Sequence, residues 1–222
     1  VNFIRAHRSQ PLLLYAAFTL PHAKHEVPDL GPYADKGWKP GAAEYAAQVT
    51  RLDDHVGLIL NTLDELKLRD NTIVFFVSDN GGPAPFGDVF HTNGELRGKK
   101  GQGYEGGLRI PAIVSWPGHI APNTLSDAPW YFADILPTFT ALAGVDPPEN
   151  IDGVSILPTL LGQPQDLADR FLYWEQNSGP FTQSVRWKNW KAVRHGLDKP
   201  LELYNLATDP SEKTDVAQAN PH

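Results

Sequence analysis

The sequence contains neither cysteine nor methionine. Without cysteine the chain can form no disulfide bond, no thiolate metal site and no cysteine nucleophile. A natural reading frame starts with methionine, whereas this chain starts with Val1, so we expect it to be processed or to be a fragment. It also has no signal-peptide pattern and no apolar run near 18 residues, so the sequence predicts no membrane span.

Positive charge is scarce, because 19 Lys and Arg residues stand against 26 Asp and Glu residues, for a net charge of −7. This balance argues against nucleic acid as the main partner. It does not exclude a small anionic substrate, because the local field of a site is separate from the net charge. With 222 residues, 41% of them hydrophobic, the chain can form one domain of good size with a small appendage.

The most informative stretch runs from Asn71 to Ile113. It opens with Thr72–Val77, an apolar run rich in β-branched and aromatic residues, which is typical of a strand buried on both faces of a parallel sheet. The run ends in the sequence SDNGG, which contains Asp79 and Asn80. Polar residues at the carboxyl end of a parallel strand lie where open α/β sheets bind their ligands.

A glycine-rich loop with three cations, Arg97, Lys99 and Lys100, follows in the same stretch. Taken alone, this loop is more simply a solvated surface, and the Asp79-Asn80 pair alone is more simply a turn. Together, after one buried strand, hard oxygen donors and a cationic loop suit a metal ion beside an anionic substrate.

A second apolar run, Pro11–Leu20, has the length of a strand and ends in the sequence PHAKH. The imidazole of His22 could protonate a leaving group there, although a single histidine is often a structural residue. Lys24 and His25 are more simply solvent-facing. The Pro- and Gly-containing segment Glu26–Gly41 is predicted to be a loop that borders the site.

The segment Ala42–Leu68 is predicted to be one long helix with a single buried stripe. That stripe comprises Tyr45, Val49, Leu52, Val56, Ile59, Leu63 and Leu66. Strand, helix and strand then form a βαβ unit. Leu108–Trp116 predicts an edge-like strand because it contains a proline, and Tyr131–Ala143 predicts a helix with Asp134 at its N-cap and Gly144 after its end.

The remainder of the chain differs in kind, and we place a domain boundary near residue 165. Short aromatic-rich strands with turns between them predict a small antiparallel sheet. These strands are Phe171–Glu175, Thr182–Trp187, Trp190–Arg194 and Leu201–Leu206, and a helical tail is expected over Ser211–Ala219. The predicted fold is therefore α/β. Residues 1–165 form part of a mostly parallel sheet flanked by helices, and residues 166–222 form a small antiparallel sheet plus helix.

Several motifs together make the chain closely resemble the C-terminal half of the type I, formylglycine-dependent sulfatases (arylsulfatases) of the alkaline-phosphatase-like superfamily. They are Pro21-His22, YAAQVTRLD from Tyr45, SDNG from Ser78, LRGKKG from Leu96, YEGGLRIP from Tyr104, WKNWK from Trp187, ELYNL from Glu202 and Asp209-Pro210. Any one of these motifs is weak, whereas jointly they are specific.

The resemblance implies a sulfatase that hydrolyses sulfate monoesters with a calcium ion, magnesium being the less favoured metal, and a formylglycine nucleophile. Asp79 and Asn80 would be metal ligands, and Lys100 and His22 would be catalytic and substrate-binding. The family's Cys/Ser-x-Pro-x-Arg motif is absent here, so formylglycine is expected in a missing N-terminal half. The isolated chain is therefore expected to be inactive.

The resemblance also implies a sulfated small molecule or glycan as substrate and a secreted, periplasmic or lysosome-like location; it leaves the oligomeric state open. Two alternatives remain at this point. One is a truncated, non-catalytic remnant module, and the other is a phosphate or phosphonate monoester hydrolase of the same superfamily. Lys24 stands where the family commonly has proline, which puts a role for Lys24 and His25 in doubt.

Overall fold

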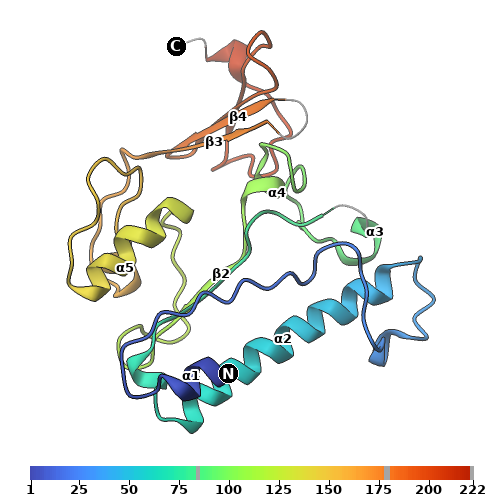
Figure 1. The fold of residues 1–222 in the computed structure, drawn as a ribbon. Coiled ribbons are helices and arrows are strands. Elements are labelled where there is room, and N and C mark those ends of the chain that lie inside the picture. The colour runs from blue at the N-terminus through green and yellow to red at the C-terminus, as the bar shows by residue number, and fades with distance from the viewer. Residues whose placement is uncertain (84–85, 178–180, 221–222) are drawn as a thin grey trace. The chain divides into compact units, whose positions relative to one another are not determined.

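The structure, a computed structural model, describes residues 1–83, 86–177 and 181–220, and its backbone packs as two units (Figure 1). The first unit is Val1–Val74 with Trp116–Gly118, and the second is Phe75–Ser115 with His119–His222. The predicted boundary near residue 165 separates an α/β part from a C-terminal antiparallel sheet, and these two units do not test it. It stays a prediction. Among the described residues, no helix combines the length and the apolar character that a bilayer crossing requires.

The first unit is built on one long helix, α2 (Ala42–Glu65), with the short helices α1 (Asn2–Ala6), η1 (Gly31–Tyr33) and η2 (Arg69–Asn71). The predicted helix is thus confirmed to within three residues of its end. Its buried side comprises Ala42, Ala46, Ala47, Gln48, Thr62 and Leu63. The predicted stripe is wrong at Val49, which is 43% exposed. The small residues Ala46 and Ala47, which are not in the predicted stripe, are buried in this part of the helix instead.

The apolar run Pro11–Leu20 forms no strand, so that prediction is wrong. A strand needs a hydrogen-bonded neighbour, and no described segment pairs with this one. Four of its large side chains are accordingly exposed, among them Tyr15 at 86%.

The predicted central strand is confirmed as β1 (Val74–Val77), which pairs with β2 (Ala112–Ser115) in a two-stranded sheet. All four residues of β1 are half-buried, not buried on both faces as predicted, because β2 is the one strand beside it among the residues that the structure covers. The short helices α3 (Gly87–Phe90) and α4 (Glu105–Leu108) lie between β1 and β2 in the sequence.

The predicted helix after β2 is confirmed as η3 (Phe132–Asp134) followed by α5 (Ile135–Ala143). Gly144 ends α5 in the left-handed conformation, at φ 69°, as the sequence predicts. The side chain of Asp134 accepts from the backbone N–H groups of Tyr131 and Val154, both at 2.9 Å. It therefore joins η3 to the segment before α6 (Leu157–Leu160). Asp134 stands at the N-cap position of α5 as predicted, but its side chain makes no capping hydrogen bond to that helix.

The C-terminal sheet is the best-predicted part of the fold. Its strands are β3 (Phe171–Gln176), β4 (Thr182–Trp187), β5 (Trp190–Arg194) and β6 (Glu202–Asn205). They pair antiparallel in the order β3-β4-β5-β6. A buried cluster of Tyr104, Val193 and Tyr204 joins this sheet to the residue that precedes α4.

The predicted helical tail is wrong, because helical structure is confined to η4 (Ala217–Ala219). The carboxylate of Asp209 accepts from the backbone N–H of Thr214 at 2.8 Å and closes a turn. Glu212 lies within that turn at φ 52°, a left-handed conformation that interrupts an α-helix. Side-chain hydrogen bonding to the backbone thus replaces the helix.

Candidate functional site

The turn that carries Asp79 and Asn80 directly follows β1. Ser78 Oγ donates to the carbonyl of Asn80 at 2.9 Å, which closes the turn. Asp79 is exposed and Asn80 is half-buried, and neither side chain has a hydrogen-bond partner among residues 1–83, 86–177 and 181–220. Gly81 holds the turn against α4, since a Cβ on it would lie 2.0 Å from the carbonyl oxygen of Gly106. The backbone of the turn is therefore fixed, while the side-chain oxygens of Asp79 and Asn80 remain available to a ligand.

Asn93 joins this turn to the cationic loop. Its Oδ1 accepts from the backbone N–H of Gly82 at 2.8 Å, and its Nδ2 donates to the carbonyls of Gly82 at 3.2 Å and Gly98 at 3.0 Å. The backbone N–H of Lys100 donates to the same Gly82 carbonyl at 3.1 Å. The structure therefore brings the backbones of the two predicted parts of the site together. Sequence reasoning missed Asn93, whose only local signal is an amide in a turn before the loop.

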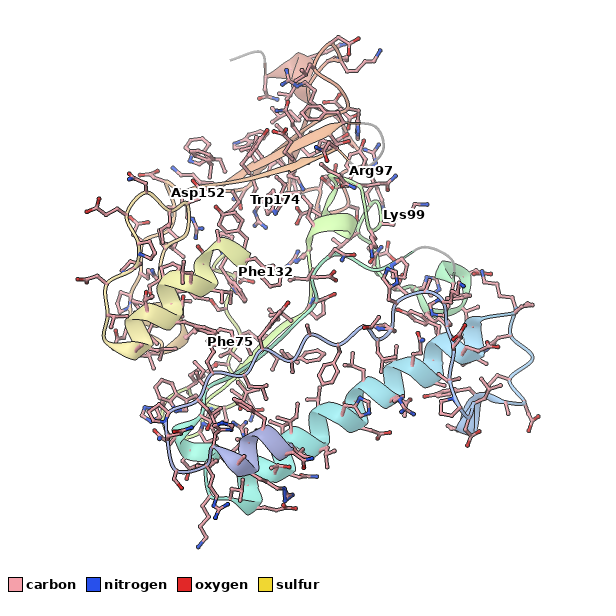
Figure 2. The ribbon with its side chains drawn as sticks, viewed as in Figure 1. Phe75, Arg97, Lys99, Phe132, Asp152 and Trp174 are labelled. Atoms are coloured by element: carbon pink, nitrogen blue, oxygen red, sulfur yellow. The ribbon has the colours of Figure 1, made fainter. Side chains whose placement is uncertain are left out.

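The three cations of the loop differ in their surroundings. Lys99 and Lys100 are exposed, and their side chains make no hydrogen bond or ion pair with any described residue. Arg97 instead lies over the ring of Tyr104 at 3.9 Å and donates to the hydroxyl of Tyr204 at 2.8 Å. Figure 2 shows Arg97 and Lys99 on the loop before α4. Two of the three predicted cations thus remain free for a ligand.

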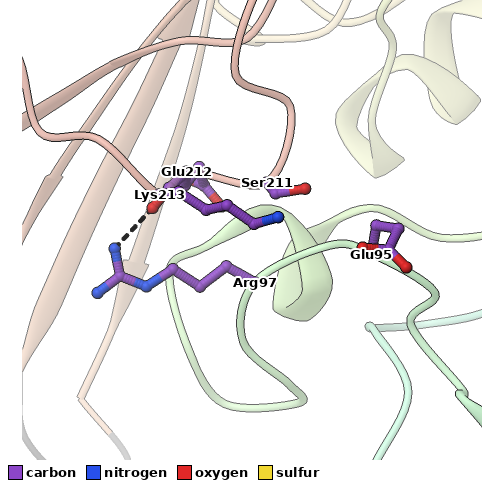
Figure 3. Close-up of a pocket in the computed structure, with 5 residues that line it drawn as sticks. All are labelled: Glu95, Arg97, Ser211, Glu212 and Lys213. Carbon is purple, nitrogen blue, oxygen red and sulfur yellow. Dashed lines mark hydrogen bonds between the residues drawn. The ribbon is translucent and has the colours of Figure 1, made fainter.

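Arg97 also borders an open pocket of about 430 Å³ (Figure 3). The pocket is lined by Glu95, Arg97, Ser211, Glu212 and Lys213. Arg97 donates to the backbone carbonyl of Glu212 at 2.9 Å, the bond drawn in Figure 3. Asp79, Asn80, Lys100 and His22 do not line this pocket, and its charges have mixed sign.

The phenols behind the loop are held neutral. Burial, and then the hydrogen bond to Glu202, raises the pKa of Tyr204 to about 12. The same two causes raise the pKa of Tyr104 further still. Both hydroxyls donate to Glu202 Oε2 at 2.7 Å. These groups therefore act as hydrogen-bond donors at neutral pH and do not supply a base.

His22 belongs to the first unit and is exposed. Its Nδ1 contacts the carbonyl of Ala23, and Nε2 has no partner in the described part of the chain. The expected convergence of His22 with Asp79 and Lys100 stays a prediction. His25, expected to face water, is half-buried and its Nδ1 lies 2.9 Å from Oε1 of the buried Gln48.

The described residues contain no group of three or more His, Asp or Glu side chains that could hold a metal ion. The chain offers Asp79 and Asn80, two hard oxygen donors that no described residue contacts through a side-chain hydrogen bond or ion pair. Such a pair fits part of a calcium site, since calcium takes six to eight oxygen ligands and accepts both carboxylate and amide oxygens. Any further protein ligands would have to come from outside this pair.

Two family models match the chain. Residues 1–145 match the model described as Sulfatase, and residues 99–222 match N-sulphoglucosamine sulphohydrolase, C-terminal. The steryl-sulfatase of Mus musculus is 36% identical over 200 residues, covering 86% of this chain and 31% of the relative. The N-acetylgalactosamine-6-O-sulfatase of Bacteroides thetaiotaomicron is 35% identical over 244 residues, covering 99% and 46%. The chain therefore spans less than half the length of these relatives.

Solved structures show the same fold. The structure titled Ps i-CgsB superposes with a TM-score of 0.87 at 30% identity, covering 99% of this chain and 49% of that one. A further structure, of a protein in complex with its substrate D-glucosamine-2-N,6-O-disulfate, has a TM-score of 0.67 at 27% identity and covers 81% and 37%. The predicted α/β fold class with a small antiparallel sheet is thereby confirmed.

Proposed function

Because this chain belongs to the sulfatase family, we propose that it contributes Asp79, Asn80, Lys100 and His22 to the site of a sulfuric ester hydrolase. One observation carries the proposal. Asp79 and Asn80 carry oxygen donors that no described residue contacts, and their turn is bonded through the backbone of Gly82 and the side chain of Asn93 to the loop of Lys100. The ammonium of Lys100 is likewise unpaired among the described residues. Such an arrangement suits a sulfate group, which carries negative charge on its outer oxygens and needs fixed cations beside it.

Lys100 is proposed to bind the sulfate and to stabilise charge on the oxygen that departs. An ammonium is a compact charge on a flexible stem, so it can follow an oxygen as the bond to sulfur lengthens. His22 is proposed to give its proton to the departing alcohol, a role that imidazole fills near neutral pH. Both groups would act more strongly in a site from which water is excluded.

Asp79 and Asn80 are proposed to hold part of a calcium ion's coordination, with magnesium the less favoured metal. A bound calcium ion would neutralise charge on the sulfate oxygens. The nucleophile is proposed to be a formylglycine supplied from outside these 222 residues, since the sequence contains no Cys/Ser-x-Pro-x-Arg motif. The isolated chain is accordingly proposed to bind calcium weakly and to be inactive.

The names of relatives and neighbours guide the proposed substrate. They include a steryl-sulfatase, N-acetylgalactosamine sulfatases and a complex with k-i-k-neocarrahexaose. We therefore propose a sulfated glycan or sulfated small molecule for this protein. An exported location, namely secreted, periplasmic or lysosomal, is proposed with it.

Turnover of p-nitrophenyl sulfate tests the proposal, with p-nitrophenyl phosphate as the competing substrate. A complete enzyme that contains this chain should hydrolyse the sulfate, and Lys100→Ala should lower kcat/KM by about a hundredfold or more. Lys199→Ala, which removes an exposed cation between β5 and β6 and outside the proposed site, should leave the rate unchanged. A preference for the phosphate ester, or turnover by the isolated 222-residue chain, would refute the proposal.

A further inference from the structure

Three charged side chains that no proposed chemical step uses are buried together in the second unit. Lys191 on β5 and Glu212 in the tail are 0% exposed, and Glu105, the first residue of α4, is 4% exposed. Lys191 Nζ lies 2.8 Å from Glu105 Oε1 and 3.5 Å from Glu212 Oε1. The carboxylate of Glu212 also accepts from the backbone N–H of Glu105 at 2.7 Å. We call Glu105, Lys191 and Glu212 the buried ion cluster.

Stability alone is a poor explanation for the buried ion cluster. Desolvation of buried charges cancels much of their attraction. Well-packed apolar side chains in the same place often give equal or greater stability. Glu212 adds two unfavourable features, because Oε1 has no hydrogen-bond partner and its backbone is left-handed at φ 52°. Burial raises the pKa of Glu212, and the nearby Lys191 opposes that rise. Lys191 and the backbone N–H of Glu105 therefore favour the charged form of Glu212 against its burial.

The cluster fixes one end of the loop that carries Lys100. We call residues 97–105 the Lys100 loop. At its far end, Glu105 is held by Lys191 and Glu212. Just before it, Ser184 Oγ donates to the carbonyl of Gly103 at 2.8 Å, and a Cβ on Gly103 would lie 2.1 Å from that hydroxyl. The loop therefore lies directly on the C-terminal sheet at this end.

The near end of the Lys100 loop is fixed to the same tail. Arg97 donates to the backbone carbonyl of Glu212. Because the carboxylate of Glu212 also accepts from Glu105, Glu212 contacts both ends of the loop. The backbone N–H of Gly106 donates to the carbonyl of Arg97 at 2.7 Å and brings the ends together. Among the described residues, Lys100 is bonded through its backbone alone, to Gly82. The path of the loop therefore sets where the flexible side chain of Lys100 starts, and so the region that its ammonium can reach.

We infer that Glu105, Lys191 and Glu212 are positioning residues that hold the Lys100 loop against the Asp79–Asn80 turn. The catalytic side of this role rests on the proposed function, whereas the contact between cluster and loop does not. A loop rich in glycine would otherwise sample many conformations. Holding both of its ends on a sheet removes that freedom before a ligand arrives, which is what pre-organisation of a charged site requires.

Hydrogen–deuterium exchange on the full chain tests the contact, with Lys191→Met as the first variant. The peptide that covers the Lys100 loop should exchange about tenfold faster or more, because the backbone bonds of Lys100, Gln102 and Gly106 lose their support. Peptides from β3 and β4 should change by less than about twofold. Lys199→Met, which removes an exposed cation near β5, is the matched control and should change neither.

Glu212→Gln is the second variant, and it decides the matter if Lys191→Met does not fold. Glutamine keeps the shape and an oxygen for the Glu105 N–H but loses the charge that faces Lys191, so a smaller acceleration confined to the loop is expected. Unchanged loop exchange in the variant would overturn the inference. Equal acceleration of loop and sheet would also overturn it, since that result describes a purely structural cluster.

The same substitutions in a complete enzyme that contains this chain test the positioning of Lys100. We expect kcat for p-nitrophenyl sulfate to fall about tenfold or more while KM changes less than about threefold, because a displaced ammonium loses contacts made in the transition state. An unchanged kcat together with faster loop exchange would overturn the positioning role. Absence of turnover by the unaltered enzyme would refute the proposed function instead, and the exchange data would still decide whether the cluster holds the loop.

Discussion

Replacing Asp134 by asparagine removes the charge of a buried carboxylate that accepts four hydrogen bonds. Asp134 is fully buried. Its Oδ1 accepts from the backbone N–H of Val154 and from Arg170, and its Oδ2 accepts from the backbone N–H of Tyr131 and again from Arg170. An asparagine amide has one oxygen, so in either orientation its NH₂ group faces one backbone N–H and one guanidinium N–H.

The expected cost follows from those contacts. Leaving a buried donor unsatisfied costs about 1–3 kcal/mol, and breaking a buried ion pair on one side costs about 3–5 kcal/mol. The two descriptions overlap, so we expect Asp134→Asn to lower the free energy of unfolding by about 4 kcal/mol. That is a large part of the roughly 5–15 kcal/mol that stabilises a typical domain.

Urea unfolding measures this loss, followed by tryptophan fluorescence and circular dichroism. Trp174, whose ring lies 6.1 Å from that of Tyr131, places one reporter close to the change. Asp152→Asn removes an exposed carboxylate from the segment before α6, and should stay within about 0.5 kcal/mol of the unaltered chain. A loss below about 1 kcal/mol for Asp134→Asn would show that water or a rearranged Arg170 satisfies these groups, and the reasoning would fail.

Two other changes test the surroundings of the candidate site. Gly81→Ala should destabilise the chain by about 2–3 kcal/mol in the same urea assay, because its Cβ would lie 2.0 Å from the carbonyl oxygen of Gly106. Gly57→Ala on α2 is the control, since its Cβ would meet open space, and it should stabilise the chain by about 0.5–1 kcal/mol. The raised pKa of Tyr204, about 12, means that the folded state keeps a proton which the unfolded state releases near pH 10. Stability should therefore fall as pH rises from about 10 to 12, by at most about 2 kcal/mol from this residue, and less in Tyr204→Phe. An equal fall in both proteins would contradict that assignment.

The elements that sequence alone predicts well are those whose signals are local. The four C-terminal strands follow from aromatic and β-branched runs between turns, and Gly144 follows from the need for a left-handed residue after α5. Pro11–Leu20 fails because an apolar run becomes a strand only beside a partner strand. The tail fails because the Asp209 side chain closes a turn and Glu212 takes a left-handed conformation.

The candidate site divides in the same way. The turn of Asp79 and Asn80 and the loop of Lys100 could be located because a strand end and a glycine-rich loop each have a local pattern. The roles of these residues, and where His22 lies relative to them, stay predictions. The groups that support them have no such pattern. Lys191 lies 86 residues from Glu105 in the sequence, and Glu212 lies 107 residues from it. Only the folded chain shows that these charges meet.

Arg97 and Lys100 show why one loop can carry two kinds of cation. The planar guanidinium of Arg97 stacks on Tyr104 and donates to the hydroxyl of Tyr204 and to the backbone carbonyl of Glu212. These contacts engage the side chain in holding the loop. The side chain of Lys100 contacts none of the residues that the structure describes. Exchanging the two residue types would place a point charge where the planar fork of Arg97 is needed. Arg97 therefore anchors the loop, whereas the role proposed for Lys100 requires a side chain that the fold leaves unpaired.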